Sequence, residues 1–339
     1  MSNLPTFTFI VPVRNESHRI DRCLQSIRSQ NYPQELIDII VPDQASEDDT
    51  RERAARYDVR IMRNPAQRAI HSLPAAFDEA KGDLIAGVAA DNPVHPEYCN
   101  RMAAAFSDPR VRFAFPWVTC DNADYPLAVR YINRFTDPFN HFVYGDASNA
   151  RDLEHIYTPV ARGDGFSLYE FPPAFPPLLA YAQGAVLRGP FHMQEGYADD
   201  VAVIFQLLES GSLVATVESA LVDHYTATSL GDVMRKFRSI IAKSLKKGSA
   251  HRWRDKYVPE VRITRRRLWP VYAASVVAPC AVALYRAIRE REPLWLYHPV
   301  MTLAFAWIMA GEALRNLPDA IDLLLRGRNR LDSSQTSKE

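Results

Sequence analysis

The sequence has no excess of charge and few cysteines. Forty lysines and arginines balance forty aspartates and glutamates over 339 residues, so the chain offers no broad positive field to a phosphate backbone. We therefore expect no nucleic-acid partner. The cysteines at 23, 99, 120 and 280 have no CxxC spacing, which argues against a zinc site and a disulfide framework. They are interpreted as ordinary thiols in the cytosol.

Several sequence motifs of common enzyme classes are also missing. The turn at residues 13–16, which follows the first apolar run, contains no glycine, so neither a P-loop nor a GxGxxG turn is present there. A GxSxG elbow is absent as well. A kinase, an ATPase, a dehydrogenase and an α/β hydrolase are therefore disfavoured. The run at 6–13 lacks the basic region and cleavage site of a signal peptide, so we expect no secretion.

Short apolar runs alternate with amphipathic stretches in the first part of the chain. We expect strands at 6–13, 36–41, 59–62 and 84–89, with helices at 19–30, 50–56 and 66–80 between them. This order predicts a parallel sheet with right-handed crossovers. Ligands of such sheets bind beyond the carboxyl ends of the strands, which is where Arg14, Asp43 and Asp91 fall. Carboxylates at one sheet edge suit a metal-bound diphosphate.

The residues at these strand ends resemble the family 2 inverting glycosyltransferases of GT-A fold. Residues 11–16, 23–27 and 30–33 are similar to the opening of that family, and residues 39–50 are similar to its strand and "DDGSTDGT" turn. The resemblance extends over residues 1–225. It implies an α/β fold, Rossmann-like with a mostly parallel sheet flanked by helices. It also implies sugar transfer from a nucleotide-diphosphate sugar.

The resemblance further implies a donor site and a divalent metal. The residues that it assigns to the nucleotide sugar are Pro12, Val13, Arg14, Asn15, Glu16, Asp43, Asp91 and Gly184. Arg68, which follows the third strand, is a further candidate, although a solvated surface position explains it equally well. The family's DxD motif falls on residues 89–91, with Ala89 in place of the first carboxylate. Asp91 and His224 are the implied ligands of Mg²⁺ or Mn²⁺, since such ions use few protein ligands.

The catalytic carboxylates are expected at residues 199 and 200. Residues 197–201 resemble the "xED" motif that opens a helix, and the resemblance makes Asp200 the base that deprotonates the acceptor hydroxyl. Asp199 would orient Asp200. Both carboxylates are also favoured simply as caps of a helix N-terminus. A lone histidine such as His224 is likewise often structural, which leaves that alternative open.

Two long apolar segments lie near the C-terminus. Residues 268–285 and 294–311 contain no charged side chain, and each is close to the length of a bilayer span. Arginines before the first and after the second place both outer ends in the cytoplasm by the positive-inside rule. Buried helices of a soluble domain, or a shallow interfacial pair, are the alternatives. Residues 233–247 form a basic amphipathic stretch, suited to an anionic leaflet or to packing on its own domain.

These observations predict four regions: a GT-A domain at 1–225, a basic connecting segment at 226–266, two membrane helices at 267–315 and a cytoplasmic tail at 316–339 whose end is disordered. The leading hypothesis is an inverting glycosyltransferase of the inner or plasma membrane, with a cytoplasmic catalytic domain and a lipid-linked or polysaccharide acceptor. Exopolysaccharide enzymes are the most similar subtype, and hopanoid or ceramide glycosyltransferases come second. Gln44 and Ala89 motivate the alternative, a degenerate GT-A protein that binds nucleotide sugar or a partner enzyme without catalysis.

Overall fold

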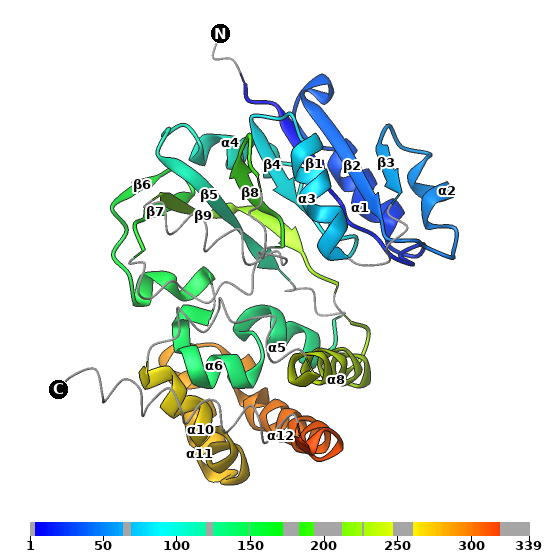
Figure 1. Cartoon of the computed structure of the whole chain (residues 1–339). Helices are drawn as coiled ribbons and strands as arrows, with labels where there is room; N and C mark the ends of the chain where they lie inside the picture. Colours follow the sequence, from blue (N-terminus) through cyan, green and yellow to red (C-terminus); the bar gives the residue numbers. More distant parts are fainter. Residues whose placement is uncertain are drawn as a thin grey trace, which may run out of the picture. The chain divides into compact units, whose positions relative to one another are not determined.

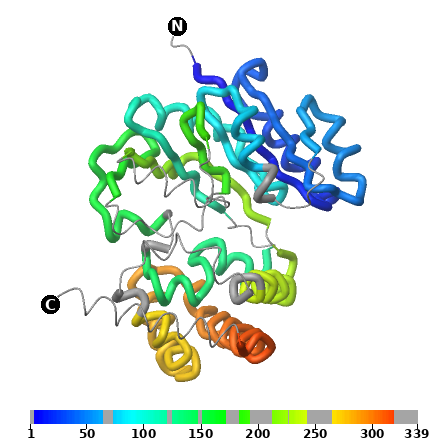
Figure 2. The backbone as a smooth tube through the Cα atoms, viewed as in Figure 1, coloured from blue at the N-terminus to red at the C-terminus, as the bar shows by residue number. Residues whose placement is uncertain are grey.

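The computed structural model describes residues 4–63, 69–119, 125–148, 150–171, 183–192, 212–225, 227–246 and 260–318. The chain divides into two compact units, whose elements are labelled in Figure 1 and whose backbone is traced in Figure 2. Unit 1 comprises Met1–Cys120 and Asp146–Tyr225, and unit 2 comprises Asp121–Gly145 and Thr226–Glu339. Residues 121–145, which lie inside the first expected region, thus cluster with the C-terminal helices.

Unit 1 is built on a nine-stranded sheet of order β3-β2-β1-β4-β8-β5-β9-β7-β6. Its strands are β1 (Phe7–Ile10), β2 (Ile37–Asp43), β3 (Arg60–Arg63), β4 (Leu84–Gly87), β5 (Val111–Thr119), β6 (Ala161–Gly163), β7 (Phe166–Tyr169), β8 (Ala185–Arg188) and β9 (Leu213–Asp223). Among the described residues of this unit, the helices are α1 (Ile20–Arg28), α2 (Thr50–Ala54), α3 (Ala69–Glu79) and α4 (Tyr98–Ala105), with single 3₁₀ turns at Gln34–Leu36, Gly145–Ser148 and Ala150–His155.

The sheet is mixed, which corrects the expectation of a mostly parallel one. Strands β3, β2, β1 and β4 are parallel to one another, as the βαβα pattern predicts. Strand β8 then runs antiparallel to both β4 and β5, and β7 and β6 are antiparallel at the far edge. The reason is topological: antiparallel neighbours need no helical crossover, so these strands lie outside the alternation of strand and helix that the sequence displays.

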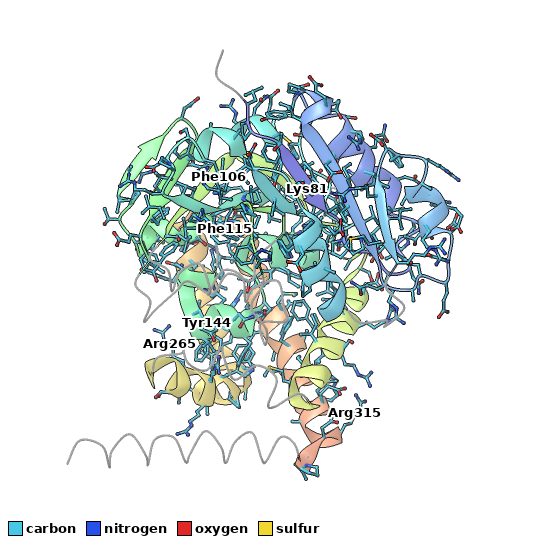
Figure 3. All side chains as sticks on the ribbon, turned by 45° about the horizontal axis from the view of Figure 1, so that its top comes forward. Lys81, Phe106, Phe115, Tyr144, Arg265 and Arg315 are labelled. Atoms are coloured by element: carbon cyan, nitrogen blue, oxygen red, sulfur yellow. The ribbon has the colours of Figure 1, made fainter. Side chains whose placement is uncertain are left out.

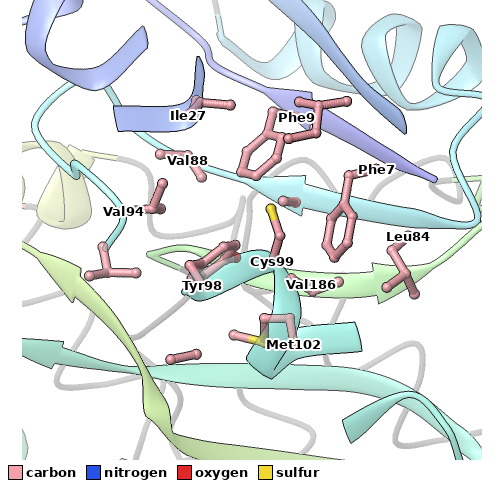
Figure 4. Packing of buried hydrophobic residues seen from close by; sticks show 14 of the residues in the cluster. Phe7, Phe9, Ile27, Leu84, Val88, Val94, Tyr98, Cys99, Met102 and Val186 are labelled. Atoms are coloured by element: carbon pink, nitrogen blue, oxygen red, sulfur yellow. The ribbon is translucent and has the colours of Figure 1, made fainter. Parts of the chain in front are cut away.

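The core of unit 1 follows from the apolar periodicity. Every residue of β1 is buried, as expected for a strand covered on both faces. On α1, Ile20, Cys23, Leu24 and Ile27 recur at helical spacing and are fully buried. Figure 4 shows Phe7, Phe9 and Ile27 packed together with α4 residues Tyr98 and Met102. This packing fixes the strand ends from which the candidate site is built.

Unit 2 is helical. It contains α5 (Leu127–Phe135), α6 (Pro138–Tyr144), α8 (Leu230–Lys246), α10 (Glu260–Ala274), α11 (Val277–Arg289), a 3₁₀ turn η4 (Pro293–Tyr297) and α12 (His298–Arg315). Asp137 caps α6 by accepting a hydrogen bond from the Asn140 N–H at 2.9 Å. Trp295 stacks on Phe135 with ring centroids 3.9 Å apart. The unit therefore has an aromatic core of its own.

The two apolar segments differ in form. The first, expected over 268–285, is divided between α10 and α11, which meet at an angle of 99°. The second lies in Pro293–Arg315, the one stretch of the described residues that is long and apolar enough by itself to cross a membrane; the bent pair would count as another only if it were one span. Core helices of soluble proteins can be equally long and apolar, so length and composition alone do not show a membrane span.

Candidate active site

The turns after β1 and β2 are joined by hydrogen bonds into one surface. Val13 bridges to Asp43, and the Gln44 N–H donates to the Val13 carbonyl at 2.9 Å. The Asn15 N–H donates to Ser46 Oγ at 3.0 Å, and Asn15 Oδ1 accepts from the Glu47 N–H at 2.9 Å. These bonds hold the predicted donor-binding turn at residues 12–16 in a fixed shape against the second turn.

Two residues of this surface have a left-handed backbone conformation. Asn15 has a φ of 55° and Ala45 a φ of 56°, in the left-handed region that side chains other than glycine rarely adopt. Asparagine is among the residues that tolerate it best. Arg14 and Asn15 are exposed, Pro12 and Glu16 are half-buried and Val13 is buried. Arg14 and Asn15 are thus the exposed polar side chains of the turn.

Asp43 lies at the end of β2 and is buried, with 1% of its surface exposed. Its carboxylate accepts hydrogen bonds from the Ser46 N–H at 3.2 and 3.4 Å and lies 3.7 Å from Arg51 Nη1. These contacts occupy part of the acceptor capacity of the carboxylate and set the shape of the turn. Asp43 therefore has a structural role in this turn.

Asp48 closes the same turn from the other side. Its carboxylate accepts hydrogen bonds from the N–H groups of Thr50 and Ser17 at 3.1 and 3.2 Å. Burial acts to raise the pKa of Asp48, but the hydrogen bonds from Thr50 and Ser17 outweigh it and lower the pKa to about 2. The Thr50 hydroxyl in turn accepts from the Glu16 N–H at 2.8 Å. Asp48 thereby connects α2 to the first turn.

Asp91 and His224 meet at the carboxyl edge of the sheet. The loop after β4 is tied to the end of β9 by the Tyr225 N–H, which donates to the Asp91 carbonyl at 2.9 Å, and by the Asp223 N–H, which donates to the Pro93 carbonyl at 2.9 Å. His224 Nε2 lies 3.9 Å from Asp91 Oδ2, with side-chain exposures of 10% and 13%. The structure thus brings together the two residues that the resemblance assigns to the metal.

A polar cluster beside this pair was not anticipated. Asp223 accepts hydrogen bonds from the hydroxyls of Thr119 at 2.8 Å and Tyr225 at 3.2 Å, and its Oδ1 lies 3.2 Å from His95 Nε2. The guanidinium of Arg22 lies 3.8 Å from the centroid of the Tyr225 ring. These residues come from four separate stretches of sequence, so no local motif indicates them. The one available signal is that Asp223 and Tyr225 flank His224.

Two further side chains border Asp91. The Cys23 thiol lies 3.5 Å from the Ala89 carbonyl, and burial, together with the negative charges of Asp91 and Glu16, raises the pKa of this thiol. Asn92 is fully buried, and neither atom of its amide has a hydrogen-bond partner in the structure as described. A buried amide without a partner is unfavourable by about 1–3 kcal/mol. Such a group next to a candidate binding residue is consistent with a ligand that satisfies it.

Gly184 lies in the tight turn before β8, where it has a φ of +71°. A Cβ there would lie 2.7 Å from Val222 Cγ2 and 3.3 Å from Pro116 Cγ. Close packing therefore explains why residue 184 is a glycine, whether or not it also contacts a sugar. The remaining predicted residues, Arg68, Asp199 and Asp200, lie outside the described residues.

The side chains at this edge of the sheet provide some of the ligands that a divalent ion needs. Asp91 supplies carboxylate oxygens and His224 an imidazole nitrogen, both of which suit Mn²⁺. Within the described ranges, no group of three or more His, Cys, Asp and Glu side chains is placed to hold a metal. The residue after Asp91, Asn92, has a buried amide without a hydrogen-bond partner among the described residues. The protein ligands present thus suit an ion that takes most of its shell from a substrate and from water.

Comparison with known proteins finds similarity to glycosyltransferases. A family model described as "Glycosyl transferase family 2" matches residues 8–163. The glycosyltransferase AglE of Haloferax volcanii is 26% identical over 112 residues, which cover 31% of this chain and 37% of that protein. An N-acetylglucosaminyltransferase of Rhizobium meliloti is 32% identical over 131 residues, which cover 35% of this chain and 30% of that protein. The chain thus spans less than two fifths of the length of either relative.

Among solved structures, the chain is similar to the mannosyltransferase PcManGT from Pyrobaculum calidifontis, determined in complex with GDP-Man and Mn²⁺. The TM-score is 0.50 at 17% sequence identity, and the alignment covers 93% of this chain and 88% of the other. At this identity the likeness concerns the fold. It agrees with the α/β architecture of a mixed sheet flanked by helices.

Proposed function

We propose that the chain, whose residues 8–163 match the model of glycosyltransferase family 2, transfers a sugar from a nucleotide-diphosphate sugar to an acceptor hydroxyl with inversion. One observation carries the proposal. The two turns at residues 12–16 and 43–50, which are joined by hydrogen bonds, and the Asp91–His224 pair all follow strands of a single sheet. Sugar donors carry a base, a diphosphate and a pyranose, and this row of groups offers contacts to all three.

In this proposal the donor is bound by the turn at 12–16, by the second turn and by Asp91, with Arg68 and Gly184 as further contacts. The residues that would hold a divalent ion are Asp91 and His224, as their 3.9 Å separation supports. PcManGT was determined with Mn²⁺ bound, which supports a divalent ion as the cofactor. Such an ion neutralises negative charge on the leaving diphosphate when it is bound. Buried Asn92 supports the same site.

The reaction needs a base in addition to the donor site. The acceptor hydroxyl oxygen forms a bond to the anomeric carbon, the bond from that carbon to the diphosphate oxygen breaks, and Asp200 takes the hydroxyl proton. The nucleoside diphosphate is the leaving group. Asp199 orients Asp200. Both assignments derive from the resemblance of residues 197–201 to the family motif.

The acceptor is proposed to be lipid-linked or a polysaccharide, at the cytoplasmic face of the inner or plasma membrane. The apolar segment Pro293–Arg315 supports a membrane location. The alternative function, binding of nucleotide sugar or a partner enzyme without catalysis, is favoured by Ala89 in place of a carboxylate.

The test compares Asp200→Asn with Asp199→Asn and the wild type. Each protein is incubated with nucleotide-sugar donors, Mn²⁺ and membrane extract, and release of nucleoside diphosphate is followed together with donor affinity. Loss of turnover in Asp200→Asn at unchanged donor affinity, with a smaller loss in Asp199→Asn, supports the proposal. Wild-type protein that binds donor without any turnover supports the degenerate alternative. Full turnover in Asp200→Asn contradicts the assignment of the base.

A further inference from the structure

Helices α11 and α12, which pack on each other, leave apolar side chains facing outward. On α11, Val277, Leu284 and Ile288 recur on one face and are 76%, 57% and 69% exposed. On α12, the exposed residues Val300, Leu303, Trp307 and Leu314 repeat at helical spacing, with Trp307 80% exposed. We call these two sets the outer faces. Soluble monomers rarely expose contiguous apolar surface of this kind.

The inner face of α12 carries polar groups that pack on other helices. His298 is fully buried, and its ring nitrogens pair with the hydroxyls of Tyr131 on α5 and Tyr272 on α10. Near the other end of the helix, Glu312 is 6% exposed and accepts a hydrogen bond from Arg238 Nε of α8 at 2.8 Å. Only the outer face of α12 is therefore available to lipid.

The packing of α8 against α12 argues against α12 as a membrane-spanning helix. Phe237 of α8 packs on Phe305 of α12 with ring centroids 4.6 Å apart, so the two helices lie against each other in the same unit. Helix α8 also carries Arg235, Lys236 and Arg238. If α12 crossed the hydrocarbon core, these cations would enter it as well, which is strongly unfavourable.

The geometry of α10 and α11 leads to the same conclusion. The chain turns by 99° between Ala274 and Val277. Helix α11 has 13 residues, a length of about 20 Å at 1.5 Å per residue, whereas the hydrocarbon core is about 30 Å thick. Helix α11 is too short to span a bilayer, but its length suits a position parallel to the surface.

Charge indicates which surface the outer faces fit. Residues 264–318 contain seven arginines, three glutamates and no lysine or aspartate. Two of the glutamates are bound within the unit: Glu290 accepts from Arg286 and from the Trp295 indole N–H, each at 2.7 Å, and Glu312 pairs with Arg238. The exposed arginines are Arg265 and Arg267 within α10, Arg289 and Arg291 at and just after the end of α11, and Arg315 at the end of α12, which also pairs with Glu312 (Figure 3 labels Arg265 and Arg315). Apolar faces flanked by arginine are complementary to anionic lipid.

We propose that the outer faces of α11 and α12 lie in one leaflet of an anionic bilayer, with both helices parallel to the membrane surface. Unit 2 is then a monotopic anchor that enters the membrane from one side and does not span it. The inference rests on the membrane location proposed above and is independent of the transfer chemistry.

The first test is flotation of the full chain with vesicles. Wild type is mixed with vesicles of equal parts phosphatidylglycerol and phosphatidylcholine, or of phosphatidylcholine alone. The double variant Ile288→Glu/Trp307→Glu places charges on the outer faces, and Val160→Glu, at a 55% exposed position of unit 1, is the matched control. Wild type and control are expected to float with the anionic vesicles, and the double variant to lose about tenfold or more in partitioning. The inference is overturned if the wild type does not bind the anionic vesicles. It is also overturned if the wild type is a dimer that the two substitutions dissociate.

The second test determines on which side the two ends of α12 lie. Leu296→Cys and Leu317→Cys place thiols at exposed positions before and after α12, in a chain whose Cys120 and Cys280 are replaced by serine. Inside-out membrane vesicles from expressing cells are treated with an impermeant maleimide. The in-plane arrangement predicts that both positions react. Protection of one position until detergent is added shows a span and overturns the inference. Donor binding is measured on the same samples, so a failed anchor model remains distinguishable from a failed transferase model.

Discussion

His224 Nε2 lies 3.9 Å from Asp91 Oδ2, at the meeting point of β9 and the loop that follows β4. If both side chains bind the ion that holds the diphosphate, His224→Ala should weaken Mn²⁺-dependent binding of nucleoside diphosphate about tenfold, or about 1.4 kcal/mol. Titration calorimetry with and without EDTA measures this effect. His192→Ala, at a position with 81% side-chain exposure, is the control and should bind like the wild type. Equal binding by both variants would remove His224 from the site.

Asn92 provides a second prediction, because its buried amide lacks a partner in the described structure. Substitution by alanine removes a side chain whose burial is unfavourable by about 1–3 kcal/mol, which offsets the lost packing. We expect Asn92→Ala to change the free energy of unfolding by less than about 1 kcal/mol. Its affinity for nucleoside diphosphate and Mn²⁺ should fall about fivefold or more. Denaturant titration and calorimetry check the two parts. A large loss of stability with unchanged affinity would make Asn92 a core residue only.

Asp48 makes stability depend on acid pH. Hydrogen bonds from Thr50 and Ser17 lower its pKa from 3.8 to about 2 in the folded chain. The unfolded state therefore binds the proton more readily, and the contribution of Asp48 to stability is present above about pH 4 and is lost as the pH falls toward 2. In Asp48→Asn this pH dependence should be smaller, and the variant should be less stable at pH 7. Urea unfolding between pH 2 and pH 7 tests this. Parallel curves for variant and wild type would contradict the prediction.

Gly184 is expected to tolerate no side chain. A Cβ would come within 2.7 Å of Val222, and the φ of +71° is strained for any L-residue. We predict that Gly184→Ala lowers the free energy of unfolding by about 2 kcal/mol or more. Gly87→Ala is the matched control, because a Cβ at Gly87 meets nothing within 4 Å. Thermal unfolding of the two variants compares them directly. Equal melting temperatures would show that the turn relaxes.

The first half of unit 1 could be predicted from sequence because its signals are local. The apolar run at Phe7–Ile10 and the helical spacing of Ile20, Leu24 and Ile27 identify a buried strand and an amphipathic helix. Strand β9 extends from Leu213 to Asp223. It pairs with β5, a contact between distant segments that periodicity does not encode. The reversal at β8 escaped prediction for the same reason.

The candidate site and the C-terminal helices show a similar division. Asp91 and His224 were singled out by resemblance, and the fold brings them together. The cluster of Asp223, His95 and Tyr225 forms only when distant segments of the chain pack together, so no sequence motif indicates it. The bend after Ala274 passes through Val276, which has a φ of 55°. A β-branched residue strongly disfavours that conformation, but Pro279 in the first turn of α11 prevents a continuous helix hydrogen bond to the Ser275 carbonyl, so the sequence does contain a local signal for the break.

The most direct test of the proposed function is calorimetric binding of a panel of nucleoside diphosphates to the detergent-purified chain. Each is titrated with Mn²⁺, with Mg²⁺ and with EDTA, into wild type and Asp91→Ala. The predicted result is binding of one nucleotide that requires the metal and is lost in Asp91→Ala while the variant remains folded by circular dichroism. Absence of nucleotide binding by folded wild type, or binding that is indifferent to metal and to Asp91, would contradict the proposed site.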